Sequence, residues 1–283
     1  MKKEIRFTKM HGAGNDYIYL DATQPLPLDF AELSREMSDI HFGIGSDGLV
    51  AIMKSDVADF RMRMFNPDGS EAEMCGNASR CVGKYVFEKG LTDKTTVTLE
   101  TLAGIKVLHL HVVDGVVESV RVDMGEPVLE PAKVPVLSES AECRISEPFR
   151  LGGREYLITG VSMGNPHGVI FTDYIDDELV LVEGPKLEVA DIFPRKANIE
   201  FAKILNRRAI EMRVWERGTG ETFACGTGAC ATAVAAVINN LTDRKVELRL
   251  RGGTLLIEWD EASNHVFMTG PAKFICDGVF YRP

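Results

Sequence analysis

Short blocks in which hydrophobic and polar residues alternate follow one another along the first 125 residues, and this pattern predicts a sheet-rich fold. Segments rich in Gly, Asn and Asp separate the blocks at residues 11–16, 43–48 and 66–69, and Asp114-Gly115 is a strong hairpin signal. We therefore expect strands at residues 5–9, 17–20, 49–53, 60–65, 97–99, 105–113 and 116–124.

Helical spacing of apolar residues interrupts this pattern. Phe30, Leu33 and Met37 form one stripe and predict a helix over residues 29–37. A second helix is expected to open at Cys75-Gly76-Asn77 and to end near residue 88, with Gly90 as its C-terminal stop. Residues 227–239 are small or apolar on every side, which predicts a buried helix.

Two parts of the chain follow the same plan. Cys225-Gly226 matches Cys75-Gly76 at an offset of 225 − 75 = 150 residues. The same offset aligns Gly14-Asn15 with Gly164-Asn165, Met62-Arg63 with Met212-Arg213, Phe65 with Trp215 and Glu71 with Glu221. A solenoid repeat has roughly 20 to 50 residues, so this longer period indicates two similar lobes.

The lobe boundaries follow from a repeated closing phrase. Met124-Gly125-Glu126-Pro127 returns as Met268-Thr269-Gly270-Pro271, which predicts an N-terminal lobe over residues 1–124, completed by the tail 272–283, and a C-terminal lobe over 125–271. Residues 127–148 show the least pattern and are expected to form an extended connection. The prediction is an α+β protein of two pseudo-symmetric lobes, each with a central buried helix, and a cleft between them.

Composition restricts the partners. The net charge of −10 and pI near 5.2, without a run of Lys and Arg, argue against nucleic acid and anionic membranes and favour a small-molecule ligand. The charged start and the lack of an apolar run of about 18 residues predict a cytoplasmic protein without a signal peptide or membrane span. In that compartment the six cysteines are expected to be catalytic, metal-binding or buried rather than disulfide-bonded.

Cys75 and Cys225 each stand at a predicted strand-to-helix turn. Unpaired N–H groups and the helix dipole favour negative charge there, so we expect a thiol pKa lowered from about 8.5 toward neutrality. Gly76 and Gly226 let a peptide N–H approach an anion such as a substrate carboxylate. Simple packing of a buried Cys is the alternative, but the recurrence of Cys-Gly favours a pair of acid/base groups. The other cysteines have no partner in register and are interpreted as structural: Cys81, Cys143, Cys230 and Cys276.

Three further features carry candidate chemistry. The Cys225 to Cys230 spacing fits a zinc ligand pair, whereas the Cys75 to Cys81 spacing does not, so a zinc site is the weaker alternative. His167 lies in a predicted loop of the repeat, where a surface histidine is the alternative to an auxiliary catalyst. Glu216-Arg217 stands where the first lobe has Asn66-Pro67; this asymmetry suits an asymmetric ligand, and an exposed ion pair is the alternative.

Longer phrases carry a family resemblance. The sequences MHGAGNDY, GIGSDGL, MRMFNPDGSEAEMCGN, VSMGNPH and MRVWERGTGETFACGTGAC resemble the diaminopimelate epimerase family in order and spacing over nearly the whole chain. MCGN together with ACGTG separates the chain from the proline racemase branch. The resemblance implies a cofactor-independent epimerase acting on LL- and meso-diaminopimelate in the lysine and peptidoglycan pathway. It also implies lobes that are each a curled, mostly antiparallel sheet around a helix.

The same resemblance implies roles for individual residues. Cys75 and Cys225 match the two catalytic thiols, and His167 and Glu216 match candidate auxiliary groups. Ile40 and Ala78 stand where Arg and Gly are usual, and Gly48 stands where some members have a Gln that contacts the substrate; these departures affect local contacts only. The resemblance implies no metal. It does not decide whether the chain forms a homodimer. The substrate contacts carry over to Asn15, Asn66, Gly76, Asn77, Asn165, Asn198, Glu216, Arg217, Gly226 and Thr227.

The implied reaction explains why two thiols are needed. Inverting an amino-acid centre requires removing the α-proton from one face and returning a proton to the other. Without an electron-sink cofactor, donors aimed at the α-carboxylate must stabilise the carbanion, a task that helix N-termini suit. Two alternatives stay open: a racemase of another amino acid on the same scaffold, against which Arg217 argues because it can grip a second carboxylate, and a non-catalytic thiol protein that binds metal or switches redox state.

Overall fold

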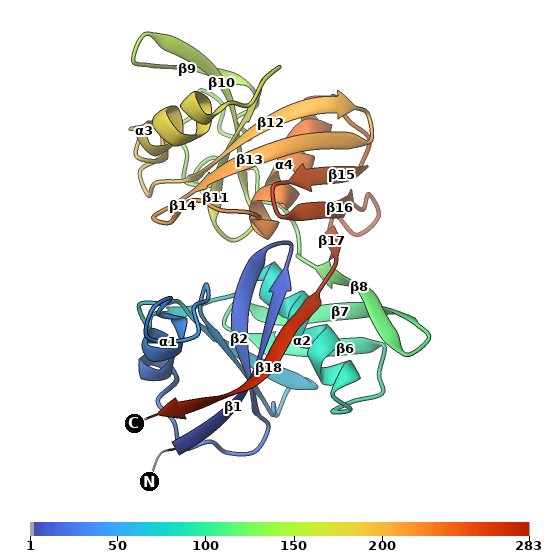
Figure 1. Cartoon of the computed structure of the whole chain (residues 1–283). Coiled ribbons are helices and arrows are strands. Elements are labelled where there is room, and N and C mark those ends of the chain that lie inside the picture. Colours follow the sequence, from blue (N-terminus) through green and yellow to red (C-terminus); the bar gives the residue numbers. More distant parts are fainter. Residues whose placement is uncertain (1–2, 283) are drawn as a thin grey trace. The chain divides into compact units, whose positions relative to one another are not determined.

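The computed structural model describes residues 3–282, and the chain divides into two compact units (Figure 1). Unit 1 comprises Met1–Val122 and Gly270–Pro283, and unit 2 comprises Asp123–Thr269. The lobe boundaries expected from the sequence, after residues 124 and 271, stay predictions. Within residues 3–282, no helix has the length and apolar character needed to cross a membrane.

Unit 1 is a mostly antiparallel sheet with the strand order β18-β1-β2-β3-β4-β6-β7-β8. The strand pairs β2–β3 and β4–β6 are parallel, and the other neighbouring pairs in this order are antiparallel. The strands are β1 (Lys3–Gly12), β2 (Asn15–Ala22), β3 (Leu49–Met53), β4 (Phe60–Phe65), β6 (Thr96–Thr101), β7 (Gly104–Val113), β8 (Val116–Asp123) and β18 (Lys273–Arg282), with the short β5 (Glu71–Ala72) beside β4.

The hairpin between β1 and β2 is tighter than the sequence predicts. The ladder continues to the pair Gly12 and Asn15, so only Ala13 and Gly14 remain in the turn, with φ of 54° and 84°. Two left-handed residues in a two-residue turn match the right-handed twist of the flanking strands. The expected turn over residues 11–16 is therefore mostly strand, and Asn15 becomes the first residue of β2.

Two helices complete unit 1. Helix α1 (Phe30–Ser38) is capped by Asp29, whose carboxylate accepts the N–H groups of Ala31 and Glu32. Helix α2 (Gly76–Glu88) is buried from Gly76 to Val86 and packs on β1, β2 and β7, so it is the central helix of the unit (Figure 1).

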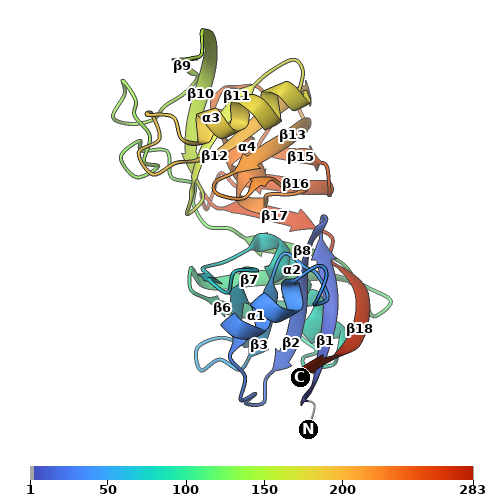
Figure 2. The same cartoon turned by 60° about the vertical axis from the view of Figure 1, so that its left-hand side comes forward.

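Unit 2 has the same plan, in the order β9-β10-β11-β12-β13-β15-β16-β17, with β11–β12 and β13–β15 as its parallel strand pairs (Figure 2). Its central helix α4 (Gly226–Ile238) packs on β10, β11, β12, β15 and β16. The remaining elements are β9 (Glu147–Leu151), β10 (Arg154–Ser162), β11 (Pro166–Phe171), the π-helical η1 (Glu178–Glu183), α3 (Gly184–Glu188), β12 (Asn198–Asn206), β13 (Ala209–Glu216), β14 (Gly220–Glu221), β15 (Lys245–Leu250), β16 (Gly253–Trp259) and β17 (Val266–Gly270).

The offset of 150 residues reappears in the geometry. Helices α2 and α4 begin at residues 76 and 226 and have 13 residues each. Arg63 Nε donates to Glu71 Oε1 at 2.8 Å, and Arg213 Nε donates to Glu221 Oε1 at 2.7 Å, so the repeated Arg and Glu residues brace equivalent strands. The predicted α+β fold of two pseudo-symmetric lobes is confirmed.

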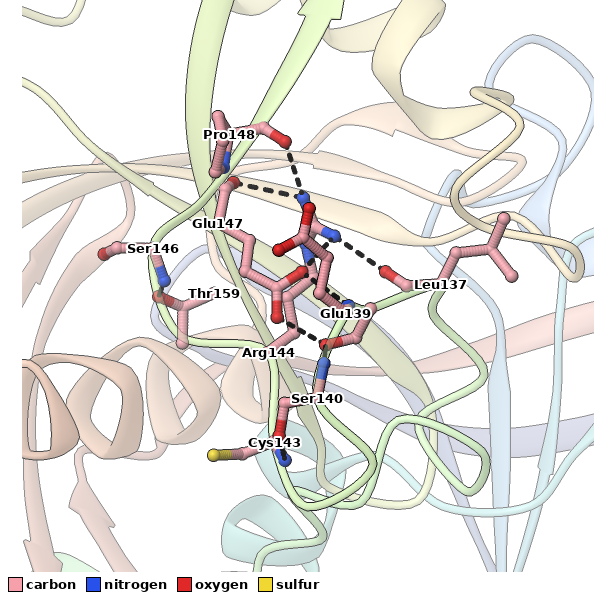
Figure 3. Close-up of polar contacts among 10 residues, drawn as sticks. Leu137, Glu139, Ser140, Cys143, Arg144, Ser146, Glu147, Pro148 and Thr159 are labelled. Carbon is pink, nitrogen blue, oxygen red and sulfur yellow. Dashed lines mark hydrogen bonds and ion pairs between the residues drawn. The ribbon is translucent and has the colours of Figure 1, made fainter.

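The connection over residues 127–148 differs from its expected extended form. Residues 131–135 form turns, and Val134 and Val136 lie in the hydrophobic core of unit 2. Arg144, only 4% exposed, donates to the carbonyl of Leu137 at 2.7 Å and to the carboxylate of Glu147 at 2.9 Å (Figure 3). A buried guanidinium requires such partners, so the segment folds back to bring Leu137 and Glu147 to Arg144.

Candidate active site

The first thiol lies at the start of the central helix of unit 1. Cys75 is the N-cap residue of α2, and its Sγ donates to Oδ1 of Asn15 at 3.4 Å. Nδ2 of Asn77 donates to the same oxygen, also at 3.4 Å. Asn15 reaches this position because the tight hairpin places it at the beginning of β2. Its own Nδ2 donates to Asp47 Oδ2 at 2.7 Å, which fixes the orientation of the amide.

A buried arginine, which the sequence did not single out, supports this arrangement. Arg80 is 0% exposed, and its Nη2 donates to Oδ1 of Asn77 at 2.8 Å. Its Nε donates to the carbonyl of Pro271 at 3.2 Å, and Nη1 donates to the carbonyl of Gly76 at 3.4 Å. The signal in the sequence was an Arg in a helix whose other positions are mostly apolar or small.

Asn66 occupies the turn after β4. Its Nδ2 donates to Oγ of Ser70 at 3.0 Å, and its carbonyl accepts Oγ of Ser34, a residue of α1, at 2.8 Å. Gly48, where some family members are expected to carry Gln, has a φ of +146°, and an added Cβ would lie 2.2 Å from the carbonyl oxygen of Phe65. A side chain therefore has no room at position 48 in this backbone conformation.

The second thiol occupies the equivalent position in unit 2. Cys225 is the N-cap of α4 and is 5% exposed. Its Sγ accepts the N–H of Gly228 at 3.3 Å and lies 3.5 Å from Oγ1 of Thr227. Gly226 and Thr227 form the first turn of the helix, so the backbone donors expected from the sequence are present beside the sulfur.

His167 is a buried strand residue, and its expected placement in a loop was wrong. It belongs to β11 and is 0% exposed. Its Nδ1 lies 2.7 Å from Oε1 of Glu200, and its Nε2 lies 2.9 Å from Oδ1 of Asn165. The parallel register pairs His167 with Asn198, and side chains two residues apart share a face of a strand. Asn198 and Glu200 therefore both lie on the side of β12 that meets His167.

Glu200 is the main residue that the sequence analysis missed. Its side chain is completely buried, and a Cβ placed on Gly228 would lie 2.7 Å from Oε1 of Glu200. The carboxylate is thus packed against the first turn of α4, beside Cys225. A sequence signal existed, because Asn198 and Glu200 place two polar residues on one face at the start of β12, where the other residues up to Ala202 are apolar.

The electrostatic environment of Cys225 reverses one expectation. Burial raises the pKa of the Cys225 thiol well above its ordinary value, and the negative charges of Glu216 and Glu200 raise it further. Hydrogen bonds from Thr227 and Gly228 act in the opposite direction but are outweighed. The expected lowering of this pKa by the helix N-terminus was therefore wrong for Cys225, because burial of the sulfur and the two carboxylates beside it outweigh the helix start.

Glu216 ends β13 and also has a perturbed carboxyl group. Burial raises the pKa of Glu216, while a hydrogen bond from Thr222 and the charge of His167 oppose the shift. The hydroxyl of Thr222 donates to Oε1 of Glu216. Burial thus raises the pKa of both neighbouring acidic groups, Cys225 and Glu216.

Arg217 follows Glu216 in a turn that Asn198 secures. Its backbone N–H donates to Oδ1 of Asn198 at 2.9 Å, and Nδ2 of Asn198 donates to the carbonyl of Pro166 at 3.0 Å. The guanidinium donates to the carbonyl of Arg195 at 3.2 Å. Because Glu216 is directed to Thr222 and Cys225, the two neighbours differ from the exposed ion pair considered as an alternative.

No group of three or more His, Cys, Asp and Glu side chains within residues 3–282 is arranged to hold a metal ion. All six cysteines are thiols in the structure.

Comparison with known proteins identifies the family. Residues 7–130 and 159–275 match the sequence model described as diaminopimelate epimerase. The chain belongs to the diaminopimelate epimerase family. The family expected from the sequence motifs is thereby confirmed.

Diaminopimelate epimerase relatives match along nearly their whole length. A diaminopimelate epimerase of Acetivibrio thermocellus is 55% identical over 274 residues, which cover 97% of this chain and 98% of that protein. One from Methanococcus maripaludis is 53% identical over 274 residues and covers 97% and 99%. The fold is shared more widely: a hydroxyproline epimerase of Agrobacterium vitis, crystallised with trans-4-hydroxy-L-proline, aligns with a TM-score of 0.71 at 15% identity, covering 99% of this chain and 92% of that one.

Proposed function

We propose that the protein interconverts LL- and meso-diaminopimelate without a cofactor, using Cys75 and Cys225 as two acid/base groups. The observation that carries the proposal is that each unit places a cysteine at the N-cap of its central buried helix. Membership of the diaminopimelate epimerase family supports the substrate. Inversion of a single carbon requires two acid/base groups, and each repeat supplies one cysteine.

The proton balance of the reaction defines the two roles. One cysteine, as thiolate, removes the α-proton from one face of the substrate, and the other, as thiol, delivers its proton to the opposite face. After one turnover the first sulfur carries the proton and the second is a thiolate. Proton exchange with solvent or a neighbouring group then restores the starting state, so no external acid or oxidant is consumed.

Stabilisation of the carbanion falls to the two helix starts. Loss of the α-proton moves negative charge onto the α-carboxylate, which backbone N–H groups can receive without rearrangement. Gly76 and Asn77 in unit 1 and Gly226 and Thr227 in unit 2 are the proposed donors, because they occupy the first turns of α2 and α4. Asn15 and Asn165 are proposed to contact the substrate beside them.

Glu216 is the proposed proton partner of Cys225. Burial and two neighbouring carboxylates favour the neutral thiol, so the resting Cys225 is the proton donor. When catalysis runs in the reverse direction, Cys225 must lose its proton, and the adjacent Glu216 carboxylate can accept it. The buried pair of His167 and Glu200 lies beside them and contributes to the charge around both groups.

Arg217 is the proposed anchor for the distal end of the substrate. A guanidinium binds a carboxylate with two parallel hydrogen bonds, which a long diacid can use and proline cannot. At the offset of 150 residues, unit 1 has Asn66-Pro67 where unit 2 has Glu216-Arg217, so the two repeats offer different groups to an asymmetric ligand. Asn198 supports Arg217 by accepting its backbone N–H. The need for two reduced thiols favours the cytoplasm as the place of action.

One assay tests the proposal. Purified protein is incubated in D₂O with LL-diaminopimelate and no added cofactor. The stereoisomers of the product are then separated, and their masses are measured by mass spectrometry. The expected result is meso-diaminopimelate carrying one solvent deuterium at the inverted carbon. L-Proline and trans-4-hydroxy-L-proline serve as parallel substrates. Exchange or inversion of these amino acids, with none of diaminopimelate, would overturn the proposal.

A further inference from the structure

A buried carboxylate that the proposed reaction does not use lies at the end of α3. Glu188 is 8% exposed, and its two oxygens face different donors. Oε2 accepts the indole N–H of Trp215 at 2.9 Å, and Oε1 accepts the backbone N–H of Gly218 at 3.0 Å. These donors lie immediately before and after Glu216 and Arg217, so one carboxylate holds the chain on both sides of the two residues.

The held segment is a turn that Asn198 and Glu188 both hold through backbone N–H groups, Asn198 at Arg217 and Glu188 at Gly218. The N–H of Thr219 donates to the carbonyl of Glu216 at 3.1 Å, and Gly218 has a φ of +77°. Glycine gives such a turn access to several conformations, because it lacks the Cβ that would exclude them. The bond from Gly218 to Glu188 restrains this position directly.

Glu188 is itself held rigidly. Its backbone carbonyl accepts the N–H of Ala197 at 3.1 Å. At the other end of α3, Gly184 lies against the Trp215 side chain, since an added Cβ would be 2.9 Å from Cβ of Trp215. The only cation near the carboxylate is the mostly exposed Lys196, with Nζ at 4.0 Å, among the ion pairs found in residues 3–282. The two N–H donors are therefore the principal partners of this carboxylate.

Unit 1 contains an independent parallel. The turn after β4, which carries Asn66, is also braced by a neighbouring helix. Oγ of Ser34 donates to the carbonyl of Asn66 at 2.8 Å, and Nη1 of Arg35 donates to the carbonyl of Asp68 at 3.0 Å. The brace in unit 1 thus holds carbonyl oxygens, whereas the brace in unit 2 holds N–H groups. In both units a helix fixes the turn that carries the candidate substrate contacts.

We propose that Glu188 is a positioning residue that fixes the 216–219 turn, so that Glu216 faces Cys225 and Arg217 is held in place for the distal carboxylate of the substrate. The part that concerns Arg217 rests on the function proposed above. The part that concerns Glu216 and Cys225 is independent of the substrate, because these groups meet within unit 2.

The primary test is Glu188→Gln. The amide keeps one acceptor oxygen but turns an NH₂ group toward one of the two donors, so one side of the turn is released. The KM for LL-diaminopimelate is expected to rise about 10-fold or more, the scale of a lost hydrogen bond to a charged group, while kcat falls less. Trp215→Phe removes one donor and leaves the carboxylate in place, so a smaller rise in KM is expected. This variant replaces Glu188→Gln as the test if Glu188→Gln does not fold.

A matched control separates positioning from general stability. Glu183 lies on the preceding η1 and bonds Tyr156 and Lys186, each at 2.8 Å, away from the turn. Glu183→Gln is expected to lower the melting temperature without changing KM. An unchanged KM in Glu188→Gln, or equal kinetic effects in Glu183→Gln, would overturn the proposal.

A readout without substrate distinguishes this proposal from the proposed function. The rate of alkylation of Cys225 by iodoacetamide is measured against pH, with peptide mapping to isolate the Cys225 signal. Displacing Glu216 removes a negative charge that raises the pKa of Cys225, so Glu188→Gln is expected to shift the alkylation profile to lower pH. If the wild type fails to epimerise diaminopimelate but this shift occurs, the proposed function fails and the positioning role stands. An alkylation profile identical to the wild type refutes the positioning of Glu216.

Discussion

Nδ1 of His167 lies 2.7 Å from Oε1 of Glu200, and both side chains are fully buried in unit 2. Three elements create this pair: β11 supplies the histidine, β12 supplies the carboxylate, and the first turn of α4 packs against the carboxylate through Gly228. The negative charge of Glu200 therefore raises the pKa of the Cys225 thiol, and this effect can be measured.

Replacing Glu200 by Gln is expected to lower the pKa of the Cys225 thiol. The substitution removes one of the two negative charges that disfavour the thiolate and keeps a carbonyl oxygen for His167. The pH dependence of Cys225 alkylation reports the change as a shift to lower pH. Glu247→Gln, at an exposed residue of β15, is the control. A profile that does not move in Glu200→Gln would show that Glu200 has no electrostatic effect on the thiol.

Replacing either proposed catalytic thiol is expected to abolish epimerisation. Cys75→Ala and Cys225→Ala should each reduce kcat by about 10²- to 10⁴-fold or more, because each removes one of the two proton carriers. Circular dichroism should show an intact fold. Cys143→Ala and Cys276→Ala, at positions that are not buried, should keep wild-type turnover. Near-native activity of either catalytic variant would contradict the two-thiol assignment.

Arg217→Met is expected to weaken substrate binding. Methionine keeps much of the side-chain length and loses the charge, so the contact with a distal carboxylate, about 1.5 to 3 kcal/mol, disappears and KM rises roughly 10- to 100-fold. The melting temperature should change little, since the guanidinium makes its hydrogen bond to a neighbouring loop carbonyl. Arg251→Met, beside Glu221, is the matched control and should leave KM unchanged. Equal KM values for the two variants would show that Arg217 is a surface residue that does not bind the substrate.

Unfolding at low pH tests the brace between Arg63 and Glu71. The hydrogen bond from Arg63 lowers the pKa of Glu71 in the folded protein. The stabilisation is therefore present above the unfolded pKa of about 4.3 and is lost as the pH falls through the lower folded value.

The measurement compares wild type with Glu71→Gln by urea unfolding from pH 7 to pH 3. The difference in the free energy of unfolding should be constant near neutrality and shrink below about pH 4. Glu261→Gln, at an exposed turn, should show no such trend. A difference that grows as the pH falls would contradict the sign of the shift.

Local signals predicted much of the fold. The bounds of β3 and β4 agree with the expected strands, and α1 and α2 begin within one residue of their expected starts. The offset of 150 residues predicted the equivalent helix starts at Cys75 and Cys225, because the repeated residues have repeated structural tasks. The assignment of these thiols to catalysis stays a prediction.

Interactions between distant strands could not be predicted in the same way. His167 was expected in a loop because Gly164 to Pro166 resemble a turn, and its burial depends on a parallel register with a strand some 30 residues later. The pKa of Cys225 is raised first by burial and then by the charges of Glu216 and Glu200, and Glu200 becomes its neighbour only through that register. The sequence around Arg144 likewise gave no local signal that residues 127–148 would fold back onto this side chain.

Strand β18 has a consequence for how the chain is made. It pairs with β1 from Lys3 with Arg282 to His11 with Lys273, so the first strand of the protein receives its outer neighbour from the last. A ribosome that adds roughly 5 to 20 residues per second leaves this edge of β1 bare for on the order of ten seconds or longer after β1 emerges. Unit 2 is continuous in sequence and can be complete before then. The half of the protein that is synthesised first is therefore the half that finishes folding last, and its uncovered strand edge is the point at which a nascent chain is open to mispairing.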